Sequence, residues 1–388
     1  MNTKRAPKVR FKGFTDAWEL RKFESIAARA SSISADPTLP RVEYEDIISG
    51  IGLLNKDVKL KGISKPGIVF NQGDILYGKL RPYLHNWFLP SFSGLAVGDF
   101  WVLQPKDADS SFLFRLIQGQ QFDDVANQSI GTKMPRADWN LVSKTLFFVP
   151  TSIDEQALIG RYFRSIDNLI TLHQRKLDKM KELKKAFLNL IFSQKLRFRG
   201  FTESWELRKL KDITYPAGEK NRENLPLDSY SITNEHGFIP QDERFENGGT
   251  MRETDKKMYY IVSPHSFAYN PARINIGSIG YQNTDKNVIV SSLYEVFKTS
   301  DDVDDRLLWY WFKSSYFQKL IEQFQEGGVR LYFYYDKLCM GTLSLPSFEE
   351  QHKIGKYLDN YDNLITLRQE KINQLTKLKT TFLKNMFL

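Results

Sequence analysis

The chain has 388 residues, of which 41% are hydrophobic, 14% aromatic and 26% charged, so it is long enough for two or three folded domains and unlike a disordered protein. Its single cysteine excludes an internal disulfide framework and any site that needs several thiolates. The 55 Lys and Arg residues exceed the 46 Asp and Glu residues by nine, which favours a polyanionic partner without requiring one.

The N-terminus is polar and basic, and no uncharged apolar run approaches the roughly 20 residues of a membrane span. We therefore expect a cytoplasmic protein with no membrane contact.

The first recognisable segment along the chain is part of an internal repeat. Residues 10–26 (RFKGFTDAWELRKFESI) return as residues 197–213 (RFRGFTESWELRKLKDI), with 11 of 17 positions identical. Residues 155–192 return as residues 350–387, with 18 of 38 positions identical. A chain with two such matches is a tandem duplication. The material between the matching segments has diverged, so we expect a shared scaffold with two different binding surfaces.

Residues 27–149, and the corresponding part of the second half, contain short apolar and aromatic runs separated by turn signals. This pattern is typical of mixed α and β structure with more strand than helix. Each divergent region later has an aromatic helix followed by a glycine-containing loop. Arg can read guanine edges, and Lys and Tyr can hold phosphates. The candidate DNA-binding residues, in these loops and at a weakly matching strand end, are Lys79, Arg81, Lys133, Arg136, Arg273, Arg330, Tyr332, Tyr334 and Lys337.

The segment that ends each half predicts a long helix. Its apolar residues follow a 4,3 spacing, which is a heptad seam, and two polar positions interrupt it in both copies: His173 and Lys184, then Arg368 and Lys379. About 40 helical residues extend roughly 60 Å. The predicted seam consists of Ile159, Phe163, Ile166, Ile170, Leu177, Met180 and Phe187 in the first copy, and of Ile354, Leu358, Tyr361, Ile365, Ile372, Leu375 and Phe382 in the second.

We find no pattern that supports catalysis. The sequence has no phosphate-binding GxxxxGK[ST] loop, and its five histidines lack metal-ligand spacing. We therefore expect no catalytic residue, metal site or cofactor in this chain.

The sequence predicts an α+β protein with four parts. These are a first globular domain (1–150), a first spacer helix (151–194), a second globular domain (195–346) and a second spacer helix (347–388). We expect both domains to be mixed α/β, and the two helices to form an antiparallel coiled coil around a pseudo-two-fold axis.

These motifs resemble the specificity (S) subunits of type I restriction-modification enzymes. The first shared motif, which we call the opener, begins each half of the chain: Gly13-Phe14-Thr15 with Trp18-Glu19-Leu20, and its second copy from Gly200 to Leu207. The second is the helix signature EQxxIGxY followed by DNLITLxQxK, which starts at Glu155 and again at Glu350. The resemblance covers the whole chain. It implies that residues 1–150 and 195–346 are target-recognition domains, each of which reads one half of a bipartite, asymmetric double-stranded DNA site. It also implies that the subunit is not itself catalytic.

The resemblance also implies partners. Two modification (methyltransferase) subunits would bind largely at the helices and would bring S-adenosylmethionine and the adenine-methylating site. Restriction/translocase subunits would then join. Two other interpretations remain open: an enzyme that modifies DNA alone, and a coiled-coil scaffold or adaptor that binds only proteins.

Overall fold

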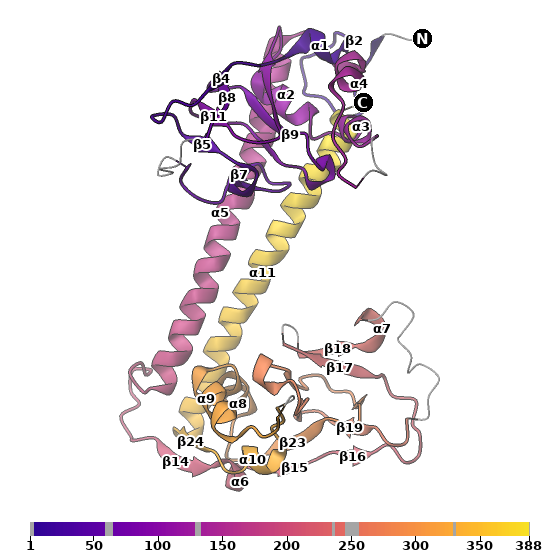
Figure 1. Ribbon diagram of the computed structural model, residues 1–388. Coiled ribbons are helices and arrows are strands. Elements are labelled where there is room, and N and C mark those ends of the chain that lie inside the picture. Colours follow the sequence, from indigo (N-terminus) through magenta and orange to yellow (C-terminus); the bar gives the residue numbers. More distant parts are fainter. Residues whose placement is uncertain are drawn as a thin grey trace. The chain divides into compact units, whose positions relative to one another are not determined.

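The computed structural model describes residues 4–58, 65–128, 133–234, 237–244, 256–328 and 331–387. They form two compact units. Unit 1 comprises Met1–Arg175 with Gln369–Leu388, and unit 2 comprises Lys176–Arg368. The boundary passes through two long helices, α5 (Ile153–Phe192) and α11 (Phe348–Met386). Each unit therefore contains the start of one long helix and the end of the other (Figure 1).

Unit 1 consists of small sheets covered by short helices. Its opener strand β2 (Trp18–Lys22) lies between β1 (Lys4–Arg5) and β13 (Leu146–Val149), so the two ends of the domain pair antiparallel. One four-stranded sheet has the order β10 (Trp87–Phe88), β9 (Ile75–Gly78), β12 (Phe100–Pro105), β3 (Ala27–Arg29). The other has the order β4 (Ile33–Ser34), β8 (Gly67–Phe70), β11 (Gly94–Ala96), β5 (Arg41–Val42). Unit 1 also contains the hairpin β6 (Ile47–Ile48) and β7 (Leu53–Leu54), and the α-helices α1 (Phe23–Ile26), α2 (Ser110–Leu116), α3 (Gln120–Ala126) and α4 (Trp139–Lys144).

Unit 2 repeats this plan with different details. Strand β14 (Glu206–Lys209) pairs antiparallel with β24 (Thr342–Leu345), as β2 pairs with β13. The larger sheet has the order β15 (Thr214–Pro216), β23 (Glu295–Thr299), β20 (Phe267–Tyr269), β21 (Ile279–Tyr281). The smaller ones are β16 (Glu219–Lys220), β19 (Tyr260–Val262) and β22 (Val288–Val290), and the pair β17 (Tyr230–Thr233) with β18 (Gly237–Pro240). The helices are α6 (Leu210–Ile213), α7 (Gln241–Arg244), α8 (Asp305–Phe312), α9 (Ser315–Phe324) and α10 (Tyr335–Leu338).

The long helices complete the core of each unit. In unit 1 the last turn of α11 enters an aromatic cluster, where the Phe387 ring lies 5.5 Å from Phe112 and Met386 is buried. In unit 2 the last turns of α5 do the same with Ile191 and Phe192. The start of one helix thus meets the end of the other in both units, so the helices run antiparallel. The predicted fold class, mixed domains with an antiparallel helix pair, is confirmed.

The predicted seam residues differ in how deeply they are buried. Buried positions occur both near the globular part of each unit and at mid-helix, and partly buried positions are interspersed with them. The buried ones are Ile159, Phe163, Ile166, Leu177, Ile354, Leu358, Ile372 and Leu375. The partly buried ones are Ile170, Met180, Phe187, Tyr361, Ile365 and Phe382.

The lysines that interrupt the seam make reciprocal ion pairs. Lys379 on α11 lies 2.8 Å from Asp167 on α5 in unit 1, and Lys184 on α5 lies 2.5 Å from Asp362 on α11 in unit 2. The four residues are two copies of one pair, because Lys184 and Asp167 each recur 195 positions later. The two lysines therefore form polar contacts between the helices, and their aspartate partners come within reach when the helices run antiparallel.

The signature residues of the repeat hold each domain to its long helix. Glu155 is buried and accepts hydrogen bonds from Arg10 Nε and Nη2 at 2.6 and 2.7 Å, and Glu350 accepts the same pair from Arg197 at 3.0 and 2.6 Å. The next residue, Gln156, donates to the Pro150 carbonyl at 2.9 Å and accepts from the Asp109 amide at 2.8 Å. Its counterpart Gln351 donates to the Pro346 carbonyl and accepts from the Asp304 amide.

The glycine of the signature lets two helices approach closely. A Cβ atom on Gly160 would overlap the Ser111 side chain and lie 2.8 Å from the Ser111 carbonyl carbon. A Cβ atom on Gly355 would lie 2.8 Å from Arg306 Cβ. The EQxxIG motif is therefore accounted for by packing and hydrogen bonding. In the described part of the chain, no helix is long and apolar enough to cross a membrane.

We expect Gly160→Ala to destabilise unit 1 by about 1–3 kcal/mol, because the added methyl group pushes α2 away from α5. The measurement is the urea midpoint of unfolding. The control is Gly328→Ala, whose methyl group would meet no atom within 4 Å. Equal midpoints for both variants would show that the contact is not needed.

Candidate nucleic-acid interface

Two loops of unit 1 join to form a basic surface. Lys79 directly follows strand β9, and Arg81 is exposed with a left-handed backbone (φ 50°). The Arg81 amide donates to the Pro135 carbonyl at 2.8 Å, and the Ala137 amide donates to the Lys79 carbonyl at 2.9 Å. This short antiparallel bridge brings Lys79, Arg81 and Arg136 together across 57 positions of sequence.

A carboxylate lies among these cations. Asp99 Oδ1 is 3.4 Å from Lys79 Nζ, and Asp99 Oδ2 is 3.0 Å from Arg136 Nη2. Partial burial raises the pKa of the Asp99 carboxyl, but the hydrogen bond from Arg136 and the positive charges of Arg136 and Lys79 outweigh it, so the net shift is downward. Asp99 therefore stays ionised and holds both cations.

The Tyr44 hydroxyl connects the same loops through two hydrogen bonds. It donates to the Asp99 carbonyl at 2.5 Å and accepts from the Leu80 amide at 3.0 Å. Burial raises the pKa of Tyr44, so the hydroxyl keeps its proton. Sequence reasoning missed Tyr44 and Asp99. Neither lies in a motif, and only the chain topology brings residues 44, 80, 99 and 136 together.

Unit 2 joins two loops in the same way. The Phe333 amide donates to the Pro271 carbonyl at 3.1 Å, which places the loop that contains Tyr332 and Tyr334 beside exposed Arg273. The rings of Tyr332 and Tyr334 stack with centroids 5.7 Å apart and planes 2° from parallel. Tyr334 is 46% exposed, so the pair presents an aromatic edge to solvent.

The remaining candidates have different surroundings. Lys133 is exposed on the unit 1 loop, three residues before Arg136. Lys337 is mostly buried, and its Nζ lies 2.6 Å from Glu326 and 3.5 Å from Asp336. Its charge is therefore used in ion pairs within its own loop. Arg330 lies outside the described residues. The structure thus gathers Lys79, Arg81 and Arg136 in one place and Arg273, Tyr332 and Tyr334 in another.

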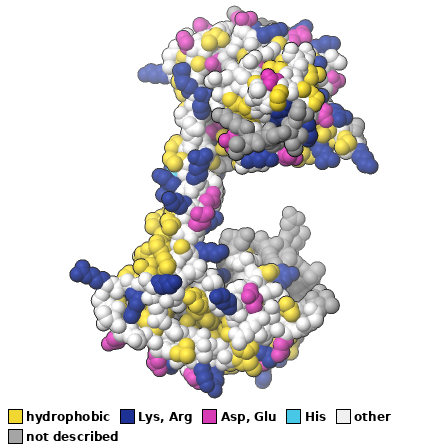
Figure 2. Space-filling model, turned by 60° about the vertical axis from the view of Figure 1, so that its left-hand side comes forward, with side chains coloured by type: hydrophobic (Ala, Val, Ile, Leu, Met, Phe, Trp, Pro, Cys, Tyr) yellow, Lys and Arg dark blue, Asp and Glu magenta, His cyan; other side chains and the backbone are white. Residues whose placement is uncertain are grey.

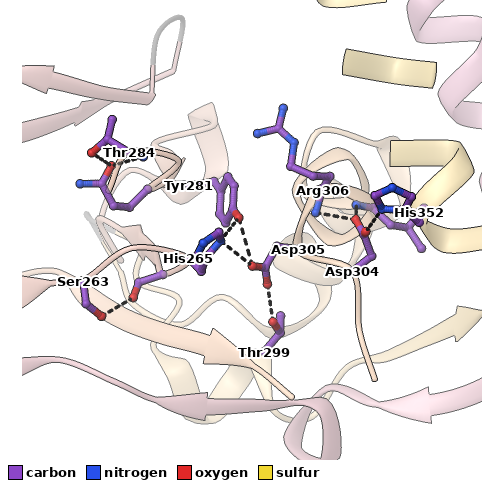
Figure 3. A network of polar contacts seen from close by, with 12 residues as sticks. Ser263, His265, Tyr281, Thr284, Thr299, Asp304, Asp305, Arg306 and His352 are labelled. Atoms are coloured by element: carbon purple, nitrogen blue, oxygen red, sulfur yellow. Dashed lines mark hydrogen bonds and ion pairs between the residues drawn. The ribbon is translucent and has the colours of Figure 1, made fainter. Parts of the chain in front are cut away.

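A polar network in unit 2 attaches helix α8 to the sheet (Figure 3). Asp305 accepts from Thr299 and, at 3.0 Å, from Tyr281, whose hydroxyl is also 2.9 Å from His265 Nδ1. Burial raises the pKa of Asp305 despite these hydrogen bonds. The neighbouring Asp304 caps α8 by accepting from the amides of Arg306 and Leu307. We assign this network a structural role.

The surface charge is mixed rather than uniformly basic. Figure 2 shows Lys and Arg side chains interspersed with acidic ones on the visible face. Within the described residues, no group of three or more His, Cys, Asp or Glu side chains could hold a metal ion. The basic loops described above are the candidate interface.

Comparison with known proteins agrees with the repeat signature. Residues 202–377 match the family model of the type I restriction modification DNA specificity domain. The type I restriction enzyme MjaVIII specificity subunit of Methanocaldococcus jannaschii is 23% identical over 358 residues, covering 84% of this chain and 80% of that protein. The EcoDI specificity subunit of Escherichia coli is 25% identical over 150 residues, covering 37% and 34%.

Solved structures share the fold. The S subunit of a type I restriction-modification system from M. genitalium aligns with a TM-score of 0.61 at 14% identity and covers 99% of both chains. A chain from a study of complex assembly and conformational transition of the type I R-M system aligns with a TM-score of 0.56 at 16% identity, over 94% of this chain and 96% of that one. Residues 202–377 therefore match the DNA specificity domain family, and the chain is similar over most of its length to a type I restriction enzyme specificity subunit.

Proposed function

We propose that the chain is the non-catalytic subunit that chooses the DNA sequence, and that units 1 and 2 each read one half of a bipartite, asymmetric site. One observation carries this proposal. Both units join the loop after a central strand to a second loop, through Ala137 and Lys79 in unit 1 and Phe333 and Pro271 in unit 2. The scaffold is the same, but the side chains on it differ, as two different half-sites require.

The chemistry of the loops suits groove reading. Arg81, Arg136 and Arg273 can donate two hydrogen bonds to a guanine edge, and lysine and tyrosine hydroxyls can hold phosphates. The two long helices join the reading units, so bases between the half-sites would be unspecified. S-adenosylmethionine and the methyl-transfer site would belong to the modification subunits.

Exposed leucines on the long helices favour docking of two such subunits. Leu169 and Leu172 on α5 and Leu378 on α11 are 40–50% exposed in unit 1. Their counterparts 195 positions away lie in unit 2: Leu364, Leu367 and Leu183. Each unit thus has the same set of three apolar side chains outside its core. Two equivalent surfaces suit the binding of two copies of one partner, the modification subunit. Restriction subunits would then join the assembled complex.

We expect Leu169→Glu combined with Leu172→Glu to reduce the complex from two modification subunits to one, because a charge replaces apolar contact at one surface only. Native mass spectrometry of the co-expressed complex measures the stoichiometry. Ser165→Glu, at an exposed position on the same helix, is the control. Retention of two subunits in the double variant would contradict docking at these leucines.

The proposed function is tested by co-expressing the chain with the modification subunit encoded beside it and mapping methylated adenines across the host genome. We expect a bipartite motif that appears only with this chain. A stable complex without sequence-dependent methylation would favour the protein-only scaffold instead.

The same mapping tests the division between units. Replacing residues 27–149 with the corresponding region of another specificity subunit should change one half of the methylated motif and leave the other half intact. This follows from the separate loop pairs of the two units. Altered bases in both halves would contradict independent reading.

A fragment ending at Gln194 should pair with itself and specify a palindromic site. It lacks Met386 and Phe387, which complete the core of unit 1, but a second copy would supply Ile191 and Phe192 at the equivalent positions. Sedimentation measures the association, and methylation mapping with the modification subunit measures the site. A monomeric fragment in the assembled complex would exclude this exchange.

A further inference from the structure

We propose that Asp99 and Tyr44 are positioning residues that set the sequence discrimination of unit 1: both hold the segments around Lys79 and Arg136 in place, and the Asp99 carboxylate also repels phosphates. This inference rests on the proposed function. It concerns residues that are not basic and that lie in no repeated motif.

Asp99 positions the two cations through contacts of both its side chain and its backbone. The Asp99 carboxylate bridges Lys79 Nζ and Arg136 Nη2, which come from two different loops. Its backbone carbonyl accepts from the Lys79 amide at 2.9 Å and from the Tyr44 hydroxyl at 2.5 Å. Asp99 thus joins three segments through its side chain and its backbone together. An arginine whose orientation is fixed in this way loses less entropy when it contacts a base edge.

The negative charge of Asp99 acts on every DNA sequence alike. Sequence-independent affinity comes from cations that neutralise phosphates and release counterions. The Asp99 side chain is 30% exposed beside the two cations, so it opposes an approaching phosphate while leaving the cations oriented. It therefore lowers affinity for non-target DNA more than affinity for a site that Arg136 reads. Specificity rises because the unwanted complex is weakened.

Three variants in complex with the modification subunit separate these effects. Asp99→Asn removes the charge, and Tyr44→Phe removes the hydroxyl without changing charge. Asp302→Asn is the matched control, because it also removes one negative charge from an arginine pair, here Arg208 at 2.9 Å, in unit 2 and outside the reading loops. The measurement is the affinity for a target duplex and for a scrambled duplex across a salt series, followed by methylation mapping.

For Asp99→Asn we expect tighter binding to the scrambled duplex and a salt dependence steeper by about one in slope, which is about a fourfold greater loss of affinity between 50 and 200 mM salt. The ratio of target to scrambled affinity should fall, and methylation should relax in one half-site only. Tyr44→Phe should lower the ratio without changing the slope. Asp302→Asn should leave the ratio unchanged.

Two results would overturn the inference while the proposed function stands. One is an Asp99→Asn complex that discriminates as well as the Asp302→Asn control. The other is equal weakening on both duplexes with an unchanged salt slope, which would show that Asp99 only stabilises the fold. A wild-type complex that binds both duplexes equally would instead refute the proposed function, and the inference with it.

Discussion

Each compact unit depends on residues from both halves of the duplicated chain. Trp18 and Phe112 of the first half pack against Phe387, the end of the second half, and Trp311 of the second half shares a core with Phe192 of the first. Neither core is complete within its own repeat. Because the ends of the long helices are core residues, the helices must pair antiparallel, and the globular parts are fastened to them.

The repeat preserves what this exchange needs. Glu155 and Glu350 hold the opener arginines, Gln156 and Gln351 hold the turns before α2 and α8, and the following glycines allow these helices to pack on α5 and α11. The Lys–Asp pairs of the helices occur reciprocally for the same reason. A shared set of contacts maintains the scaffold, while the loops between these positions are free to diverge.

The divergent loops are joined by backbone hydrogen bonds in both units. Amide-to-carbonyl hydrogen bonds connect them in both units, so the joint tolerates different side chains. Unit 1 uses this freedom for a cationic cluster around Asp99, and unit 2 uses it for a stacked tyrosine pair beside Arg273. The Asp99 carboxylate among these cations is the feature on which the proposed discrimination by unit 1 rests.

The sequence was sufficient to predict the duplication, the long helices, the mixed domains and the resemblance to specificity subunits, because repeats and heptad spacing are local patterns that survive divergence. It also marked Lys184 and Lys379 as interruptions of the seam, but their Asp partners became visible only in the folded helix pair. The folded chain was needed to show which candidate cations lie together, that Lys337 pairs with Glu326 of its own loop, and that Tyr44 and Asp99 hold the loops of Lys79 and Arg136. The contacts of Tyr44 and Asp99 join short segments up to 92 positions apart through sheet topology, which leaves no periodic signal in the sequence, so sequence patterns could not predict them.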